Sequence, residues 1–147
     1  MATTYSRLLC PQAIVDLRLW VMSLAVKRLK VDYSKKLAAQ LENCLTEFIK
    51  TLKRKGSAED ILSAERLLAD MPKSNEDNMF PDYVGPVVLK SWLVDVALEE
   101  LKHHPSKRKA TTLKHWMEIS KTALNSELET GRKYQFQMAQ VIELMYR

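Results

Sequence analysis

Pro86–Leu101 reads PVVLKSWLVDVALEEL, and this stretch is apolar around most of a helical circumference. Ser91, Asp95 and Glu99 recur every four positions, which confines them to one narrow stripe of a helix. A helix with so much apolar surface is stable in water only when other helices cover it. We therefore expect Pro86–Leu101 to be the central helix of a helical bundle.

The segments on both sides of this helix have a similar pattern. Apolar residues recur at three- and four-residue spacing over about 11–30, 35–55, 57–71 and 111–146. Gly56 follows the second segment and is expected at a helix C-terminus with a positive φ angle. The chain has only 3 Gly and 5 Pro, few for an all-β protein with frequent turns. The sequence thus predicts an all-α fold, a single-domain antiparallel bundle of five or six helices, because short connections favour antiparallel neighbours.

The last of these segments, 111–146, keeps one apolar stripe along its length. Gly131 interrupts the stripe, at a cost of about 1 kcal/mol in the interior of a helix. A pair between Glu129 and Lys133, at positions i and i+4, would span this glycine. We expect one long C-terminal helix with Gly131 as the position where it can kink. Two helices that break near Gly131 are the alternative.

The chain of 147 residues is long enough for one domain with its own core. Three segments of the domain 1–147 are expected outside the helices: an N-terminal arm at 1–10, an acidic polar loop at 73–83 and a basic connection at 105–110. The most apolar run, 19–26, is too short to cross a bilayer. We therefore expect no contact with a membrane.

The cysteine content indicates an intracellular protein. Cys10 and Cys44 lie in separate segments and have no metal-type spacing. A small secreted domain usually carries more cysteines, arranged in a disulfide framework. We expect reduced thiols that act as small buried hydrophobes, and a cytoplasmic location.

Charge is distributed unevenly along the chain, whose net charge is +5. Residues 1–55 contain 11 Lys/Arg against 4 Asp/Glu, and residues 101–147 contain 9 against 4. Residues 56–100, in contrast, contain 3 against 10. This basic, acidic, basic order suits both internal pairing and an external anionic partner.

Most of the basic residues lie where a structural explanation suffices. Lys53, Arg54 and Lys55 end one predicted helix, and Lys102 lies near the end of another. Cations at a helix C-terminus are favoured by roughly 0.3–1 kcal/mol. The triplet 107–109 differs because it precedes a predicted helix N-terminus, where the dipole disfavours positive charge. Such a triplet is either a solvated surface or a contact for an anion.

An up-and-down order of helices would bring these basic groups to the same end of the bundle. A patch formed in this way would hold a phosphate backbone through charge and would read little sequence. Glu59 and Asp60 would lie nearby and neutralise part of it. The predicted nucleic-acid-binding residues are Lys107, Arg108, Lys109, Lys102, Lys53, Arg54 and Lys55.

No pattern in the sequence indicates a metal site, a cofactor or catalysis. The histidines at 103, 104 and 115 could converge only through a tight fold of the intervening loop, and a zinc site needs at least three converging ligands. The spacing E-x-x-H occurs at Glu100–His103 alone, whereas a di-iron site needs it twice. The chain has no P-loop, no nucleophile elbow and no dinucleotide-binding glycine motif. We therefore expect a protein that is not an enzyme.

Two functional hypotheses follow from these patterns. The first is a small accessory or regulatory protein that binds DNA or RNA electrostatically. The second is a protein–protein adaptor or regulator that acts through its C-terminal helix or the acidic loop 73–83. The lone aromatic residues Tyr134, Phe136 and Tyr146 could form a partner surface, and Tyr134–Tyr146 is the segment expected at a homodimer contact.

Overall fold

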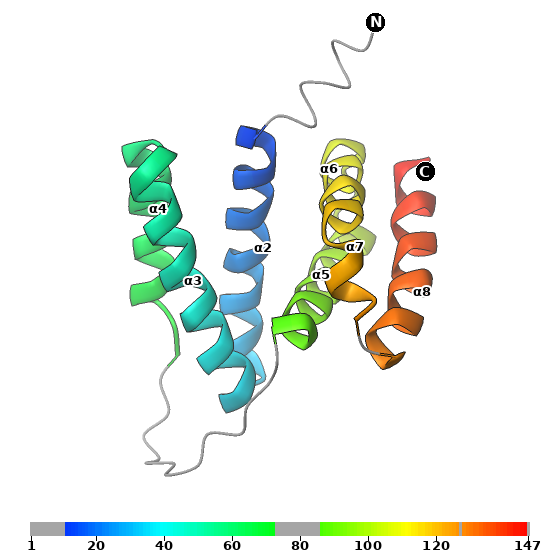
Figure 1. The fold of residues 1–147 in the computed structure, drawn as a ribbon, viewed down its shortest axis with the longest axis horizontal. Helices are drawn as coiled ribbons and strands as arrows, with labels where there is room; N and C mark the ends of the chain where they lie inside the picture. The colour runs from blue at the N-terminus through cyan, green and yellow to red at the C-terminus, as the bar shows by residue number, and fades with distance from the viewer. Residues whose placement is uncertain (1–10, 73–85, 127, 147) are drawn as a thin grey trace, which may run out of the picture.

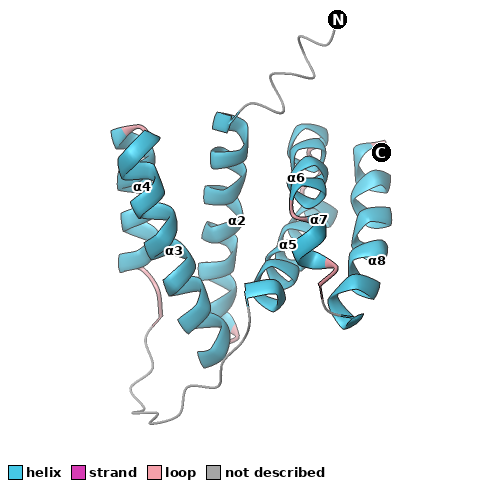
Figure 2. Cartoon of the chain, in the orientation of Figure 1, coloured by secondary structure: helices cyan, strands magenta, loops and turns pink. Residues whose placement is uncertain are grey.

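The computed structural model describes residues 11–72, 86–126 and 128–146, and every regular element in these ranges is a helix (Figures 1 and 2). The all-α prediction is confirmed. The predicted arm 1–10 and the predicted acidic loop 73–83 lie outside the described residues. The described helices are α2 (Pro11–Val31), α3 (Lys35–Lys55), α4 (Ala58–Ala69), α5 (Pro86–His103), α6 (Lys107–Ile119), α7 (Lys121–Leu124) and α8 (Leu128–Met145).

The helix predicted to be central, α5, contacts α2, α3, α6, α7 and α8. Its residues Val94, Ala97 and Leu101 have no exposed surface, because helices cover it from several sides. Burial of apolar surface on this scale is the main favourable term in the folding of such a chain. None of the described helices combines the length and the hydropathy that are needed to cross a membrane.

In the first half of the chain, the helices are joined by short connections whose residues mark the helix ends. The side chains of Ser34 and Ser57 accept hydrogen bonds from backbone N–H groups in the first turns of α3 and α4. Gly56 lies between these two helices, but its φ angle is −93°, so the predicted positive φ is wrong. A Cβ atom at this position would lie 2.8 Å from the Leu52 side chain and 2.9 Å from the Leu52 carbonyl oxygen. Glycine is therefore needed here because a Cβ atom would be too close to Leu52, and not because the backbone has a positive φ angle.

The segment after residue 106 forms three helices, so the prediction of one long C-terminal helix is wrong. The chain breaks at Ser120 and again after Leu124, while Gly131 lies inside α8. Asn125 and Ser126 favour the second break, because their side chains donate hydrogen bonds to the carbonyl oxygens of Lys121 and Ala123. The alternative of a break near Gly131 is wrong as well.

The apolar stripe continues through the breaks because the chain folds back on itself. α8 packs against both α5 and α6, so the apolar residues on both sides of the breaks enter the same core. The charge pair predicted within α8 is replaced by a pair between helices: Lys133 pairs with Asp95 of α5 and not with Glu129.

The ends of the helices define two ends of the molecule in Figure 1. The upper end contains the N-terminus of α2, the C-terminus of α8, and the connections from α3 to α4 and from α5 to α6. The end of α2 and the start of α3 lie at the lower end. Because α2 contacts both α4 and α6, it lies between these two helices.

Candidate functional site

The basic triplet belongs to the first turn of α6. Ser106 is the N-cap of this helix, and its hydroxyl oxygen accepts a hydrogen bond from the backbone N–H of Lys109 at 3.3 Å. The predicted basic connection 105–110 is therefore wrong in its extent, because helix begins at Lys107. Three positive side chains thus extend from the positive end of a helix dipole, where both the dipole and the side chains attract an anion.

All seven predicted site residues are exposed to solvent. None of them lies within 4.0 Å of a carboxylate oxygen belonging to another described residue. Other lysines in the described ranges do have such partners, as Lys30 has in Asp70 at 2.6 Å. These seven side chains therefore form no ion pair with a described carboxylate that would stabilise the fold.

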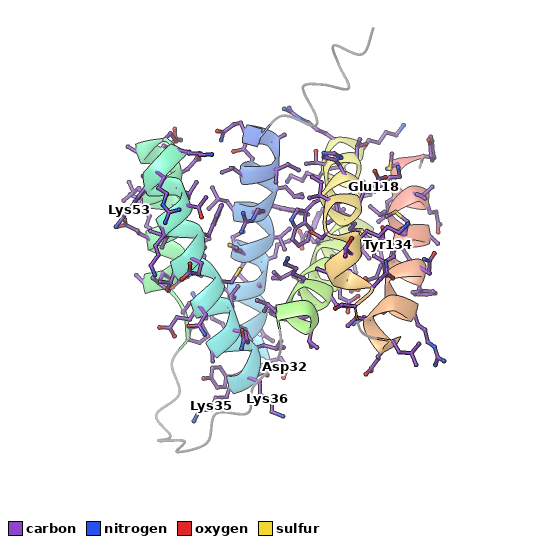
Figure 3. The ribbon with its side chains drawn as sticks, viewed as in Figure 1. Asp32, Lys35, Lys36, Lys53, Glu118 and Tyr134 are labelled. Atoms are coloured by element: carbon purple, nitrogen blue, oxygen red, sulfur yellow. The ribbon has the colours of Figure 1, made fainter. Side chains whose placement is uncertain are left out.

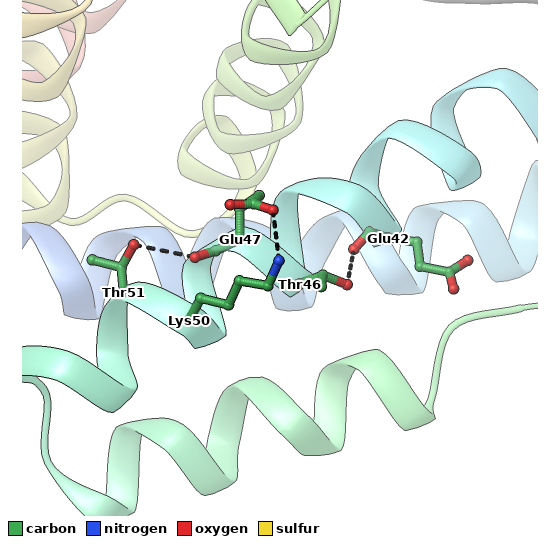
Figure 4. Close-up of polar contacts among 5 residues, drawn as sticks. All are labelled: Glu42, Thr46, Glu47, Lys50 and Thr51. Atoms are coloured by element: carbon green, nitrogen blue, oxygen red, sulfur yellow. Dashed lines mark hydrogen bonds and ion pairs between the residues drawn. The ribbon is translucent and has the colours of Figure 1, made fainter.

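The basic residues in the second half of α3 differ in whether they form an ion pair. Lys50 pairs with Glu47 at 3.2 Å on the outer face of this helix, where Thr46 and Thr51 donate hydrogen bonds to backbone carbonyl oxygens (Figure 4). The residues of the last turn, 53–55, have no such partner among the described residues. Lys53 extends outward from this part of α3 (Figure 3).

The basic residues form two groups at the upper end of Figure 1. One group comprises Lys102 in the last turn of α5 and the triplet 107–109 that opens α6. The other group, at the end of α3, lies beyond the start of α2 in this view. Between the two groups, Gln12 of α2 donates hydrogen bonds to Asp16 at 2.8 Å and to Asp60 at 3.1 Å. The structure thus brings four of the predicted residues together and leaves the α3 residues as a separate group.

An aromatic side chain joins the α6 group to α2. The ammonium nitrogen of Lys109 lies 4.6 Å from the centroid of a Trp20 ring, within the range of a cation–π contact. These two residues and Arg108 line a surface cavity of about 260 Å³, which Asp16 also lines. Asp16 makes no ion pair with either cation, although it lowers the positive potential of the cavity.

The sequence analysis did not connect Trp20 with the basic triplet. Trp20 and Lys109 are far apart in the sequence and meet only because α6 packs against α2. No local pattern around either residue indicates this contact. A half-buried tryptophan beside exposed cations adds a flat surface on which an aromatic ring could stack.

The histidines are used in local pairs. His103 lies 3.1 Å from Glu99, and His104 lies 3.9 Å from Glu100, each one helical turn away in α5. In the described ranges, no group of three or more His, Cys, Asp or Glu residues could hold a metal ion. The carboxylate in the E-x-x-H motif, Glu100, is therefore placed beside His104 rather than His103.

The aromatic residues Tyr134, Phe136 and Tyr146, in α8 and directly after it, do not form one surface. Tyr134 is only 3% exposed, so its prediction as part of an exposed dimer surface is wrong. Phe136 and Tyr146 are exposed, at 65% and 80% of their surface. Tyr134 points toward α6 instead, because the inner face of α8 packs there (Figure 3).

The chain matches no protein-family model, no curated protein and no solved structure.

Proposed function

We propose that this chain is a small, non-enzymatic accessory or regulatory protein of the cytoplasm that binds nucleic acid electrostatically, with the start of α6 as its main contact. The observation that carries the proposal is the basic triplet 107–109. Its three cations are exposed, have no described carboxylate partner and lie at the positive end of a helix. This arrangement costs stability through the dipole, and a phosphate backbone would offset that cost.

The proposed binding mode uses Lys102 and the triplet together, with the basic end of α3 as a second contact to the backbone. This binding mode requires that the helices form an antiparallel bundle in solution, because only this arrangement keeps both basic groups at one end of the molecule. Backbone contacts of this kind position a nucleic acid without selecting its sequence. Trp20 favours single-stranded segments, whose bases can stack on an aromatic ring.

The test is fluorescence anisotropy with generic labelled DNA and RNA, from about 50 to 300 mM salt. The wild type is compared with the variant Lys107→Ala/Arg108→Ala/Lys109→Ala. We expect a steep negative slope of log affinity against log salt for the wild type. The slope should become shallower by roughly 2–3 in the variant, about 0.7–0.9 for each lost phosphate contact.

A matched control separates this site from net charge. Lys27→Ala/Arg28→Ala/Lys121→Ala removes three exposed cations from the rest of the surface and lowers the net charge equally. This control should keep the wild-type slope. No binding at low salt, or the same change of slope in both triple variants, would contradict the proposal.

A second candidate function is a protein–protein adaptor, with homodimerisation as one form of it. Leu128, Phe136 and Tyr146 of the chain's C-terminal part are 65–80% exposed, more than is usual for large apolar side chains. The acidic loop 73–83 is the other candidate surface of this hypothesis and lies outside the described residues. Light scattering over a concentration series tests the homodimer: a dimer that Phe136→Ser/Tyr146→Ser converts to monomer would favour this function.

A further inference from the structure

A second cavity, of about 180 Å³, contains two cations that the proposed function does not use. Arg18 of α2 and Lys90 of α5 line it together with Cys44 of α3. Val21, Leu93 and Trp116 contribute to its apolar part. The cavity thus combines positive charge with an apolar interior, and side chains from four helices build it.

Neither cation has a carboxylate partner within 4.0 Å in the described part of the chain. The guanidinium carbon of Arg18 lies 4.1 Å from the centroid of the Phe48 ring, which holds the side chain in place. Burial lowers the pKa of Arg18, because the charged form loses contact with water. The cavity therefore contains a partly desolvated positive charge, which is unfavourable unless an anion compensates it.

Cys44 does not supply that anion. Burial raises the pKa of its thiol, and this effect exceeds the opposite effect of the neighbouring Arg18 and Lys90. The thiol therefore stays neutral near pH 7 and offers no negative charge to Arg18 or Lys90. A ligand that carries one negative charge would pair with them.

We propose that this cavity binds a small amphipathic monocarboxylate, such as a medium-chain fatty acid or an aromatic acid. Arg18 presents a planar fork that matches a carboxylate, and Lys90 adds a second positive charge. The apolar body would lie against Val21, Leu93 and Trp116. A cavity of roughly 150 Å³ holds a benzene molecule, so the observed volume suits a short chain or a single ring.

The first experiment is isothermal titration calorimetry of the full chain with octanoate, and with 1-octanol and inorganic phosphate as the two controls. Octanoate should bind at least about tenfold more tightly than either control, because it alone combines the apolar chain with the carboxylate. From butanoate to octanoate, each methylene should strengthen binding about fourfold until the cavity is filled. Equal binding of octanol and octanoate would overturn the proposal, and so would equal binding of phosphate.

The second experiment uses variants of the two cations. Arg18→Met and Lys90→Met should each weaken octanoate binding about tenfold or more, since each removes a charge-assisted contact. Arg18→Lys should retain part of the affinity because it keeps the charge. Lys27→Met, which removes an exposed lysine from the same helix as Arg18, is the matched control and should bind octanoate as the wild type does. An unchanged affinity in Lys90→Met would contradict the proposal.

A third measurement does not depend on the folding of the variants. It is the rate at which iodoacetamide alkylates Cys44 in the wild type, followed by mass spectrometry of the tryptic peptide that contains this residue. Saturating octanoate should slow this reaction several-fold, because the ligand would cover the thiol. If octanoate binds but alkylation of Cys44 is unchanged, the ligand lies elsewhere and this cavity is not its site.

Discussion

Where α8 packs against α5, the charged and amide side chains of the contact pair with one another. Asp95 of α5 accepts a hydrogen bond from the Gln137 side chain at 2.7 Å and forms an ion pair with Lys133. Where α6 packs against α2, the basic residues have no described carboxylate partner, and Lys109 lies over Trp20 instead. The same types of side chain thus stabilise the fold at one contact and are exposed to solvent at the other.

This difference has a physical origin in burial. Gln137 is 1% exposed, and its amide NH2 group donates both of its hydrogen bonds to α5, whereas its amide oxygen has no hydrogen-bond partner among the described residues. The cations of the α6 group are exposed, so water solvates them and no internal partner is required. Substitutions that remove paired side chains of the α5–α8 contact should therefore lower stability, whereas those at the start of α6 should lower binding.

The largest expected effect is that of Gln137→Ala. This change removes two hydrogen bonds to α5, including one to the Ser91 carbonyl oxygen, and leaves a small cavity. We expect the free energy of unfolding to fall by about 2–4 kcal/mol, as measured by urea denaturation. Gln135→Ala, at an exposed position of the same helix, should stay within about 0.5 kcal/mol of the wild type. Equal effects of the two changes would show that the buried amide is not important for this contact.

Lys109→Ala at the α2–α6 contact should instead affect nucleic-acid binding more than stability. Loss of the contact with Trp20 should cost no more than about 1 kcal/mol of stability, because the lysine is exposed. The salt slope of nucleic-acid binding should nevertheless fall by about 0.7–0.9 in the anisotropy measurement. A stability loss as large as that of Gln137→Ala would remove the distinction between the two contacts.

A small gain in stability is expected for Ser91→Ala. The hydroxyl oxygen of Ser91 is buried and has no hydrogen-bond partner among the described residues. Removing it should raise the free energy of unfolding by about 0.5–1 kcal/mol, because its desolvation cost disappears. A loss of stability in urea denaturation would mean that this hydroxyl has a partner after all.

The difference between the two contacts was only partly predictable from the sequence. Local patterns identified the helices before residue 107, because each has a strong apolar period and most have clear end signals, such as Ser57 at the start of α4. The same method failed for the last segment. The spacing of apolar residues is the same for one straight helix and for a chain that folds back, when all of these residues enter the same core. Exposed cations could be predicted from their positions at helix ends. Their lack of described partners and the contact of Lys109 with Trp20 could not, because both depend on long-range packing.

The smallest effect concerns alkaline pH and extends the comparison to the α6–α8 contact. Burial raises the pKa of Tyr134, and the negative charge of Glu118 raises it further, while Lys114 opposes the shift (Figure 3). As the pH rises above about 10, the tyrosine of the unfolded chain ionises first, so the free energy of unfolding should fall. The stabilising contribution is complete below that pH and is lost on the alkaline side.

Tyr134→Phe should make stability less dependent on pH above about 10, because phenylalanine cannot ionise. Urea denaturation between about pH 8 and 11 measures this dependence, and Tyr33→Phe, at an exposed position near the start of α3, serves as the control. All other titratable groups are the same in the wild type and Tyr134→Phe, and the comparison between variants removes their contribution. A pH dependence of Tyr134→Phe that equals that of the control would mean that water reaches the Tyr134 hydroxyl in the folded protein. The α6–α8 contact would then be open to solvent at the position where the structure shows it to be closed.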